Sequence, residues 1–196
     1  MKSRSRKFYI KHMGRLIPVN NGHITHDLYW SPKILKGVID RLDDLLNRCR
    51  KVFAFFFVQQ VVKKSSANGA VIELRTLVTK HLRKNFPKIP FHYCWVREES
   101  NDDNLHYHWI LLIDAKAPPS FHWFFQFMQQ LRKRFVKTSN VHFPTKPYYL
   151  LDSLKVKKGS LKTYFDFVYR ASYLAKLNSK ELIPVGVHRY GWSRFR

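Results

Sequence analysis

The sequence predicts an α+β fold of the ferredoxin-like kind, in which helices cover one face of an antiparallel sheet. Three observations support this prediction. Helix-like and strand-like segments alternate along the 196 residues, two strand-like segments in the middle are separated only by turn-forming residues, and 45% of the residues are hydrophobic. That much apolar sequence can fill a full core, and strands joined by a short turn must pair in antiparallel fashion.

Four amphipathic helices are expected from apolar residues at helical spacing. The first begins at Ser31-Pro32, where serine can cap the helix and proline suits the first helical position. Ile34, Val38 and Leu42 then follow on one face. The expected helices cover residues 32–49, 71–86, 121–136 and 160–177.

Four strands are expected between and beside these helices, at residues 52–62, 92–99, 105–114 and 141–143. The second and third strands form a hairpin, because residues 100–104 have turn-forming chemistry. We expect a single domain, in which a basic N-terminal segment with the first helix (residues 1–50) packs on a core (residues 51–196). The core ends in a basic, aromatic tail at residues 188–196.

The chain carries a large excess of positive charge. It contains 36 Lys and Arg residues against 13 Asp and Glu residues, for a net charge of +23. Self-repulsion of this size opposes a compact state, and binding to a polyanion relieves it. Aromatic residues make up 16% of the chain, and exposed rings can stack on unpaired bases. The composition therefore predicts a nucleic-acid-binding protein.

Several other classes are disfavoured by the composition. Two cysteines, Cys49 and Cys94, are too few for a disulfide framework or a cysteine-based zinc site, which suits a reducing cytoplasm. The longest apolar run, residues 52–58, is too short to span a bilayer, and the basic N-terminus is not followed by the apolar stretch of a secretory signal. We expect a cytoplasmic protein with no membrane partner.

A pair of histidines stands at the start of the apolar strand 105–114. His106 and His108 are two residues apart, so both imidazoles point to one face of the strand. Glu98 or Glu99, at the end of the neighbouring strand, would return close to them across the hairpin. Two nitrogens and one carboxylate leave positions open for a phosphate oxygen, as a catalytic Mg²⁺ or Mn²⁺ requires. Packed or surface histidines share this spacing, so the pattern alone leaves both interpretations open.

A tyrosine and a lysine share one face of the last expected helix. Tyr173 and Lys176 are three residues apart, and Tyr169 lies one turn earlier. A cation near a phenol stabilises the phenolate, which can attack phosphorus and form a covalent phosphotyrosine. An amphipathic helix with a lysine reaching into solvent has the same spacing, and packing is the simpler role for Tyr169.

Taken together, these segments resemble a known family. Trp95-Val96-Arg97-Glu98, the strand 105–114 and Ala171-Ser172-Tyr173-Leu174-Ala175-Lys176 follow one another as three blocks do in rolling-circle replication initiators. In particular, the sequence resembles the YagK/YfjJ group, which is related to the replication initiators of filamentous phages (inoviruses). The resemblance covers residues 50–178 in order and spacing.

The resemblance implies a particular site and chemistry. It implies the fold of the His-hydrophobic-His (HUH) endonucleases, with His106 and His108 as ligands of Mg²⁺ or Mn²⁺. Glu98 is the preferred third ligand and Glu99 its alternative. Tyr173 is implied as the nucleophile that keeps the 5′ phosphate and releases a 3′ hydroxyl, with Lys176 as its helper. Some relatives use two tyrosines, and Tyr169 would be the second.

The resemblance also implies partners. The substrate would be single-stranded DNA or a DNA hairpin at the origin of a phage, plasmid or integrated element. A helicase and a polymerase would come from the host or phage, because 196 residues leave no room for a helicase domain. Two alternatives stay open: a non-catalytic DNA-binding protein with the same fold, and a single-stranded RNA-binding protein. The histidines, the acidic residue and the tyrosine–lysine pair together favour the enzyme.

Overall fold

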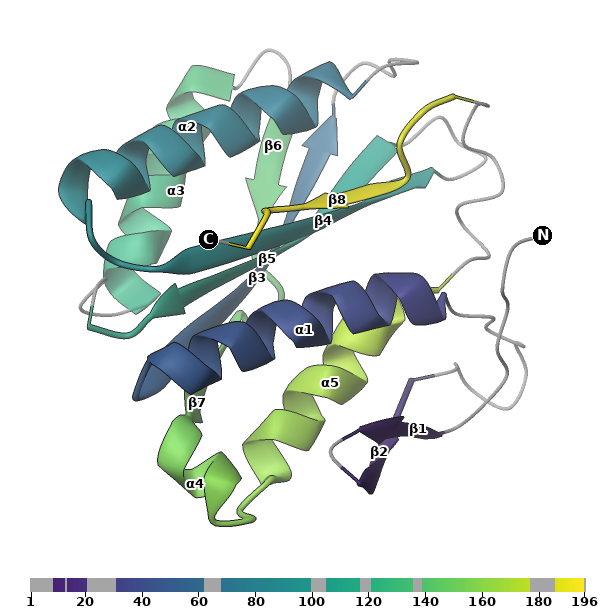
Figure 1. Cartoon of the computed structure of the whole chain (residues 1–196). Coiled ribbons are helices and arrows are strands. Elements are labelled where there is room, and N and C mark those ends of the chain that lie inside the picture. Colours follow the sequence, from purple (N-terminus) through teal and green to yellow (C-terminus); the bar gives the residue numbers. More distant parts are fainter. Residues whose placement is uncertain are drawn as a thin grey trace.

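The structure is a computed structural model in which a mixed α+β chain forms a central antiparallel sheet between two layers of helices (Figure 1). None of the helices within the described residues is long and apolar enough to cross a membrane. The structure describes residues 9–12, 14–20, 31–61, 68–99, 105–116, 121–135, 139–176 and 186–195.

The central sheet has the strand order β6-β3-β5-β4-β8, with β7 also paired to β3, and every neighbouring pair is antiparallel. Because α2 follows β3 and α3 follows β5, the order β6-β3-β5-β4 is that of a ferredoxin-like sheet. The predicted α+β class is therefore confirmed. The strands are β3 (Lys51–Val61), β4 (Phe91–Glu99), β5 (Leu105–Asp114), β6 (Ser139–His142), β7 (Tyr148–Asp152) and β8 (Tyr190–Trp192).

Helices cover both faces of this sheet, so the expectation of one covered face is wrong. In Figure 1, α2 and α3 lie above the sheet, whereas α1 and α5 lie below it. Apolar side chains of β3 supply both cores: Phe55 and its alternate neighbours face α2 and α3, and Phe56 and its alternate neighbours face α1 and α5. An uninterrupted apolar strand is typical of burial on two sides. The helices are α1 (Pro32–Arg48), α2 (Gly69–Asn85), α3 (Phe121–Phe135), α4 (Ser153–Lys157) and α5 (Lys162–Leu174).

Helix α1 begins as the sequence predicts. Ser31 is its N-cap, the Ser31 Oγ accepts a hydrogen bond from the backbone N–H of Ile34 at 3.4 Å, and Pro32 opens the helix. The apolar stripe through Val38 and Leu42 is fully buried against the sheet. The cap and the stripe together explain why this helix starts and packs where it does.

Five short elements were not expected from the sequence: β1 (Tyr9–His12), β2 (Arg15–Pro18), β7, α4 and β8. β1 and β2 form a hairpin that turns at Gly14, whose φ of 71° lies in the region that favours glycine. β8, from the expected basic tail, adds an edge strand to β4. These elements are short, and only partners distant in sequence stabilise them.

Candidate active site

The two histidines of β5 lie side by side on the face of the sheet that α1 and α5 cover. His106 and His108 share this face with Ile110 and Leu112, which belong to the core beneath those helices. Their ring centroids are 6.5 Å apart, and both side chains are half-buried. The structure therefore brings the predicted pair together at one end of the sheet.

Glu98 joins the histidines from the neighbouring strand. In the register of β4 and β5, Glu98 lies opposite His106, and Val96 lies opposite His108. The Glu98 carboxylate reaches diagonally across the strands, and its Oε2 contacts His108 Nε2 directly. The side chain is nearly buried, so this contact forms away from bulk solvent.

Glu99 points to the opposite face of the sheet, where it forms a buried ion pair. Arg97 Nη2 lies 2.6 Å from Glu99 Oε1, and Arg97 also donates a hydrogen bond to Asn68 Oδ1 at 3.1 Å. Strand alternation separates the two adjacent glutamates, so Glu98 is the one that faces the histidines.

Lys176 connects the tyrosine to this cluster. Its Nζ donates a hydrogen bond to the Tyr173 hydroxyl at 2.7 Å and lies 2.7 Å from Glu98 Oε1. Burial of Lys176 opposes its charge, but the contacts with Glu98 and Tyr173 outweigh this effect and raise the lysine pKa. The ammonium is therefore charged at neutral pH and placed between the phenol and the carboxylate.

The end of α5 is held in place by segments from the other end of the chain. The backbone N–H of Ser31 donates to the carbonyl of Ala175 at 2.8 Å, and the backbone N–H of Asn20 donates to Ser172 Oγ at 2.7 Å. Ala175 and Ser172 flank Tyr173 in sequence. These bonds set the position from which Tyr173 and Lys176 reach the sheet.

Tyr169 and Tyr173 both line a cavity of about 600 Å³ beside the histidines. The exposed fractions of the two tyrosines are 45% and 39%, so both rings are accessible. His108 forms part of the wall, and Arg170 and Lys146 add positive charge to it. In the structure it is Tyr173 that the lysine contacts.

The chain matches the family model of the YagK/YfjJ C-terminal domain over residues 71–193. The chain belongs to the YagK/YfjJ family. The matched region runs from α2 to the residue after β8, so it contains the two histidines, both glutamates, both tyrosines and Lys176. It starts later and ends later than the resemblance seen in the sequence motifs. No curated protein and no solved structure matches the chain.

The side chains of this YagK/YfjJ site suit a divalent cation by type. Burial and the nearby His108 lower the pKa of His106, so its ring is neutral at pH 7, the form that binds metals, and its Nδ1 is buried without a well-formed hydrogen bond. Among the described residues, however, no three His, Cys, Asp or Glu side chains are arranged as a complete metal site. Glu98 is instead engaged by His108 and Lys176.

Sequence reasoning missed Gln60 as a neighbour of this YagK/YfjJ site. Gln60 of β3 lies opposite His106 in the β3–β5 register, and its Oε1 is 3.1 Å from His142 Nε2 of β6. The available signal is weak, because Gln60 is one of two glutamines near the end of a mostly apolar strand. Only the pairing register shows which residues of β3 flank the histidines.

Proposed function

We propose that this protein is a metal-dependent endonuclease and strand transferase of the HUH tyrosine type that nicks and rejoins single-stranded DNA. The observation that carries the proposal is the position of Lys176, which joins the Tyr173 hydroxyl to Glu98. Glu98 in turn contacts His108. A nucleophile, a cation and a carboxylate–histidine cluster thus meet in one half-buried site, as covalent phosphoryl transfer requires.

In the proposed reaction, the Tyr173 oxygen attacks the phosphorus of a DNA phosphodiester. A bond forms between the tyrosine oxygen and phosphorus, and the bond from phosphorus to the 3′ oxygen breaks. The 5′ phosphate stays on the tyrosine, and the proton lost by the phenol is balanced by the proton that the released 3′ oxygen gains. Joining is the reverse reaction, in which a 3′ hydroxyl attacks the phosphotyrosine.

Lys176 would assist the first step electrostatically. Its ammonium already donates to the phenol oxygen, so negative charge that develops there during attack is stabilised without reorganisation. Contact with Glu98 keeps the ammonium in place. His106, His108 and Glu98 would hold Mg²⁺ or Mn²⁺, because Glu98 faces His108 through Oε2 while its Oε1 stays with Lys176. Such an ion polarises a phosphate oxygen when bound.

The cavity beside Tyr173 suits a nucleotide next to the cleaved phosphate. Tyr149 and Tyr169 are among its aromatic lining residues, and Arg170 and Lys146 can contact phosphate oxygens. The Arg170 guanidinium stacks over the ring of Phe56 at 4.5 Å, which fixes it at the cavity wall. A DNA strand bound there would present its backbone to the phenol.

Two features of the fold bear on the alternatives. A sheet that binds RNA needs an open aromatic face, whereas helices cover both faces of this sheet. A non-catalytic DNA-binding protein would not need a lysine aimed at a tyrosine hydroxyl.

We further propose that the activity starts rolling-circle replication of a phage, plasmid or integrated element, at a single-stranded or hairpin origin, with a helicase and polymerase supplied by the host or phage.

The proposal is tested by trapping the covalent intermediate. The protein is incubated with a labelled single-stranded DNA library and Mn²⁺, and the adduct is mapped by mass spectrometry. We expect the nucleotide on Tyr173, no adduct with Tyr173→Phe, and an adduct with the matched variant Tyr169→Phe. Lys176→Ala should slow adduct formation about ten- to a thousandfold, as loss of one electrostatic donor does.

The outcomes separate the competing assignments. Phenylalanine differs from Tyr173 only by the hydroxyl, and the ring is partly exposed, so its packing is kept. Loss of the adduct in Tyr173→Phe therefore reports loss of the nucleophile and not loss of the fold. A nucleotide found on Tyr169 would show that the nucleophile is assigned wrongly. If no tyrosine carries a nucleotide with any metal or substrate, the non-catalytic DNA-binding protein becomes the better conclusion.

A further inference from the structure

A second basic surface lies at the other end of β4 from the candidate active site. A groove of about 960 Å³ runs between the C-terminal half of α2, the start of β4 and residues 192–195. His92 and Tyr93 of β4 lie in this groove, whereas Glu98 lies in the active site, so the two are separated by about 20 Å along the strand. Six cationic side chains line it: Arg48, Arg75, Lys80, Arg83, Lys88 and Arg194.

The groove wall formed by the C-terminal segment is firmly anchored. The buried Arg41 of α1 donates to the carbonyl of Ser193 from Nε at 2.8 Å and from Nη2 at 2.6 Å. His92 Nδ1 lies 2.7 Å from Ser193 Oγ, and the backbone N–H of Ser193 donates to the carbonyl of Tyr93 at 3.0 Å. These bonds hold the segment as a fixed wall of the groove.

One wall carries an accessible aromatic ring. The side chain of Phe195 is 53% exposed, and the Arg41 guanidinium supports the ring at 4.7 Å from its centroid. His92 also contacts this ring edge-on. Because the ring is supported from beneath, its exposed part can stack on a base at a small cost in conformational entropy.

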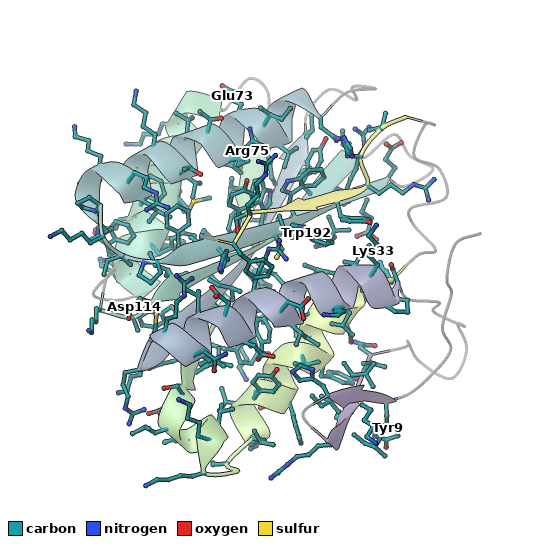
Figure 2. All side chains as sticks on the ribbon, in the orientation of Figure 1. Tyr9, Lys33, Glu73, Arg75, Asp114 and Trp192 are labelled. Carbon is teal, nitrogen blue, oxygen red and sulfur yellow. The ribbon has the colours of Figure 1, made fainter. Side chains whose placement is uncertain are left out.

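The opposite wall presents groups that bind phosphate. Arg75, Thr79 and Arg83 recur at four-residue spacing along α2, with Thr76 and Lys80 beside them. Figure 2 shows Arg75 on the side of α2 that faces β8, and Glu73 on its outer side. None of the residues that line the groove is acidic in the part of the chain that the structure describes. Guanidinium, ammonium and hydroxyl groups in a row fit successive phosphates.

We propose that this groove is a second nucleic-acid-binding site, which holds a single strand by its phosphates and stacks a base on Phe195. The combination of a cationic row with an accessible ring favours an unpaired strand. The groove is concave, which suits a strand better than the flat surface of an anionic membrane. The inference does not depend on the proposed nicking reaction, because the groove contains none of the active-site residues.

The test compares two charge-matched double variants. Arg75→Glu/Lys80→Glu alters the groove. Lys155→Glu/Lys157→Glu makes the same charge change on the exposed surface of α4, which lies beside α5 and is separated from α2 by the sheet (Figure 1). Binding of a fluorescent single-stranded oligonucleotide is measured by anisotropy at several salt concentrations. We expect the groove variant to bind at least about tenfold more weakly than the control, with a salt slope reduced by about 1.4 for two lost phosphate contacts.

A second variant tests stacking without a change of charge. Phe195→Ala should weaken oligonucleotide binding by about tenfold and leave the salt slope unchanged, because stacking releases no counterions. Melting temperatures of all variants establish that they are folded. If the groove and α4 variants weaken oligonucleotide binding equally, the effect comes from net charge alone and the proposal is overturned. Loss of binding to anionic vesicles with unchanged DNA binding would identify a membrane surface instead, which also overturns it.

The test of the groove can be distinguished from the test of the nicking reaction. The groove variant should still form the Tyr173 adduct at saturating DNA. If no adduct ever forms, the comparison of groove and α4 variants still decides whether the groove binds a strand. A groove variant that binds DNA normally rejects this site whatever the active site does.

Discussion

At the scale of single residues, Glu98 and Glu99 show how one position along a strand changes the role of a side chain. Glu98 contacts His108 and Lys176 on the face beneath α1 and α5. Glu99 lies on the other face, in an ion pair with Arg97, whose side chain is 0% exposed. Substitution of Glu98 should therefore affect metal binding, whereas substitution of Glu99 should affect the stability of the fold.

We predict that Glu98→Gln removes the rise in melting temperature that Mn²⁺ causes, because a neutral amide is a poor ligand in place of the carboxylate. The matched variant Glu99→Gln should keep the Mn²⁺ effect but lose about 3–5 kcal/mol of stability, since it leaves a buried guanidinium without its counter-charge. Thermal unfolding with and without Mn²⁺ measures both effects. An undiminished Mn²⁺ shift in Glu98→Gln would exclude this carboxylate as a ligand.

At the scale of elements, the attachment of β8 depends on close packing against α1. Figure 2 shows Trp192 between the sheet and α1. A Cβ atom added at Gly37 of α1 would lie 2.5 Å from Cζ3 of that ring. The guanidinium of Arg41 lies 4.8 Å from the ring centroid, so the indole is confined from two sides.

We predict that Gly37→Ala destabilises the protein by about 1–3 kcal/mol through overpacking, although alanine favours helices over glycine. Trp192 should be displaced, which a change in tryptophan fluorescence would report. Gly69→Ala in α2 is the control, because an added Cβ there meets nothing within 4 Å. It should leave stability unchanged or slightly increased. Equal effects of the two substitutions would contradict the packing argument.

The longer elements and part of β6 could be predicted from sequence, whereas the other short elements could not. Helix α1 has a serine cap and an apolar stripe, and β5 has an apolar run long enough to identify it. β7 and β8 have no comparable local pattern. β7 forms because Tyr148–Asp152 pairs with the first half of β3, and β8 forms because it pairs with β4 while Trp192 packs on α1. Both strands are stabilised by contacts with residues far away in the sequence, which local sequence patterns do not show.

At the scale of the whole molecule, a net charge of +23 makes the folded state sensitive to further protonation. His92 is 2% exposed and contacts both Asp44 and Ser193. Burial lowers the pKa of His92, and the nearby cations Arg41 and Arg48 act in the same direction, against Asp44. The neutral ring is therefore the form that the folded protein accommodates.

We predict that the free energy of unfolding falls as the pH drops below about 6.5, the pKa of an unfolded histidine. At pH values between the lowered pKa of folded His92 and about 6.5, the unfolded chain binds more protons than the folded protein, so stability rises with pH. Above about 6.5 the ring is neutral in both states, and the contribution of His92 to stability is fully present. Denaturant unfolding at a series of pH values measures the slope. His92→Gln should flatten it, and an unchanged slope would show that His92 is not its source.

The α+β class, the main helices and strands, and the residue types of the candidate site could all be predicted from the sequence alone. Local periodicity and capping carry that information, because they depend on neighbours a few residues apart. The folded structure was needed to show that helices cover both faces, that Glu98 rather than Glu99 faces the histidines, and that Lys176 reaches both Tyr173 and Glu98. Strand parity, register and the docking of α5 set these contacts, and each depends on pairing between residues far apart in the chain.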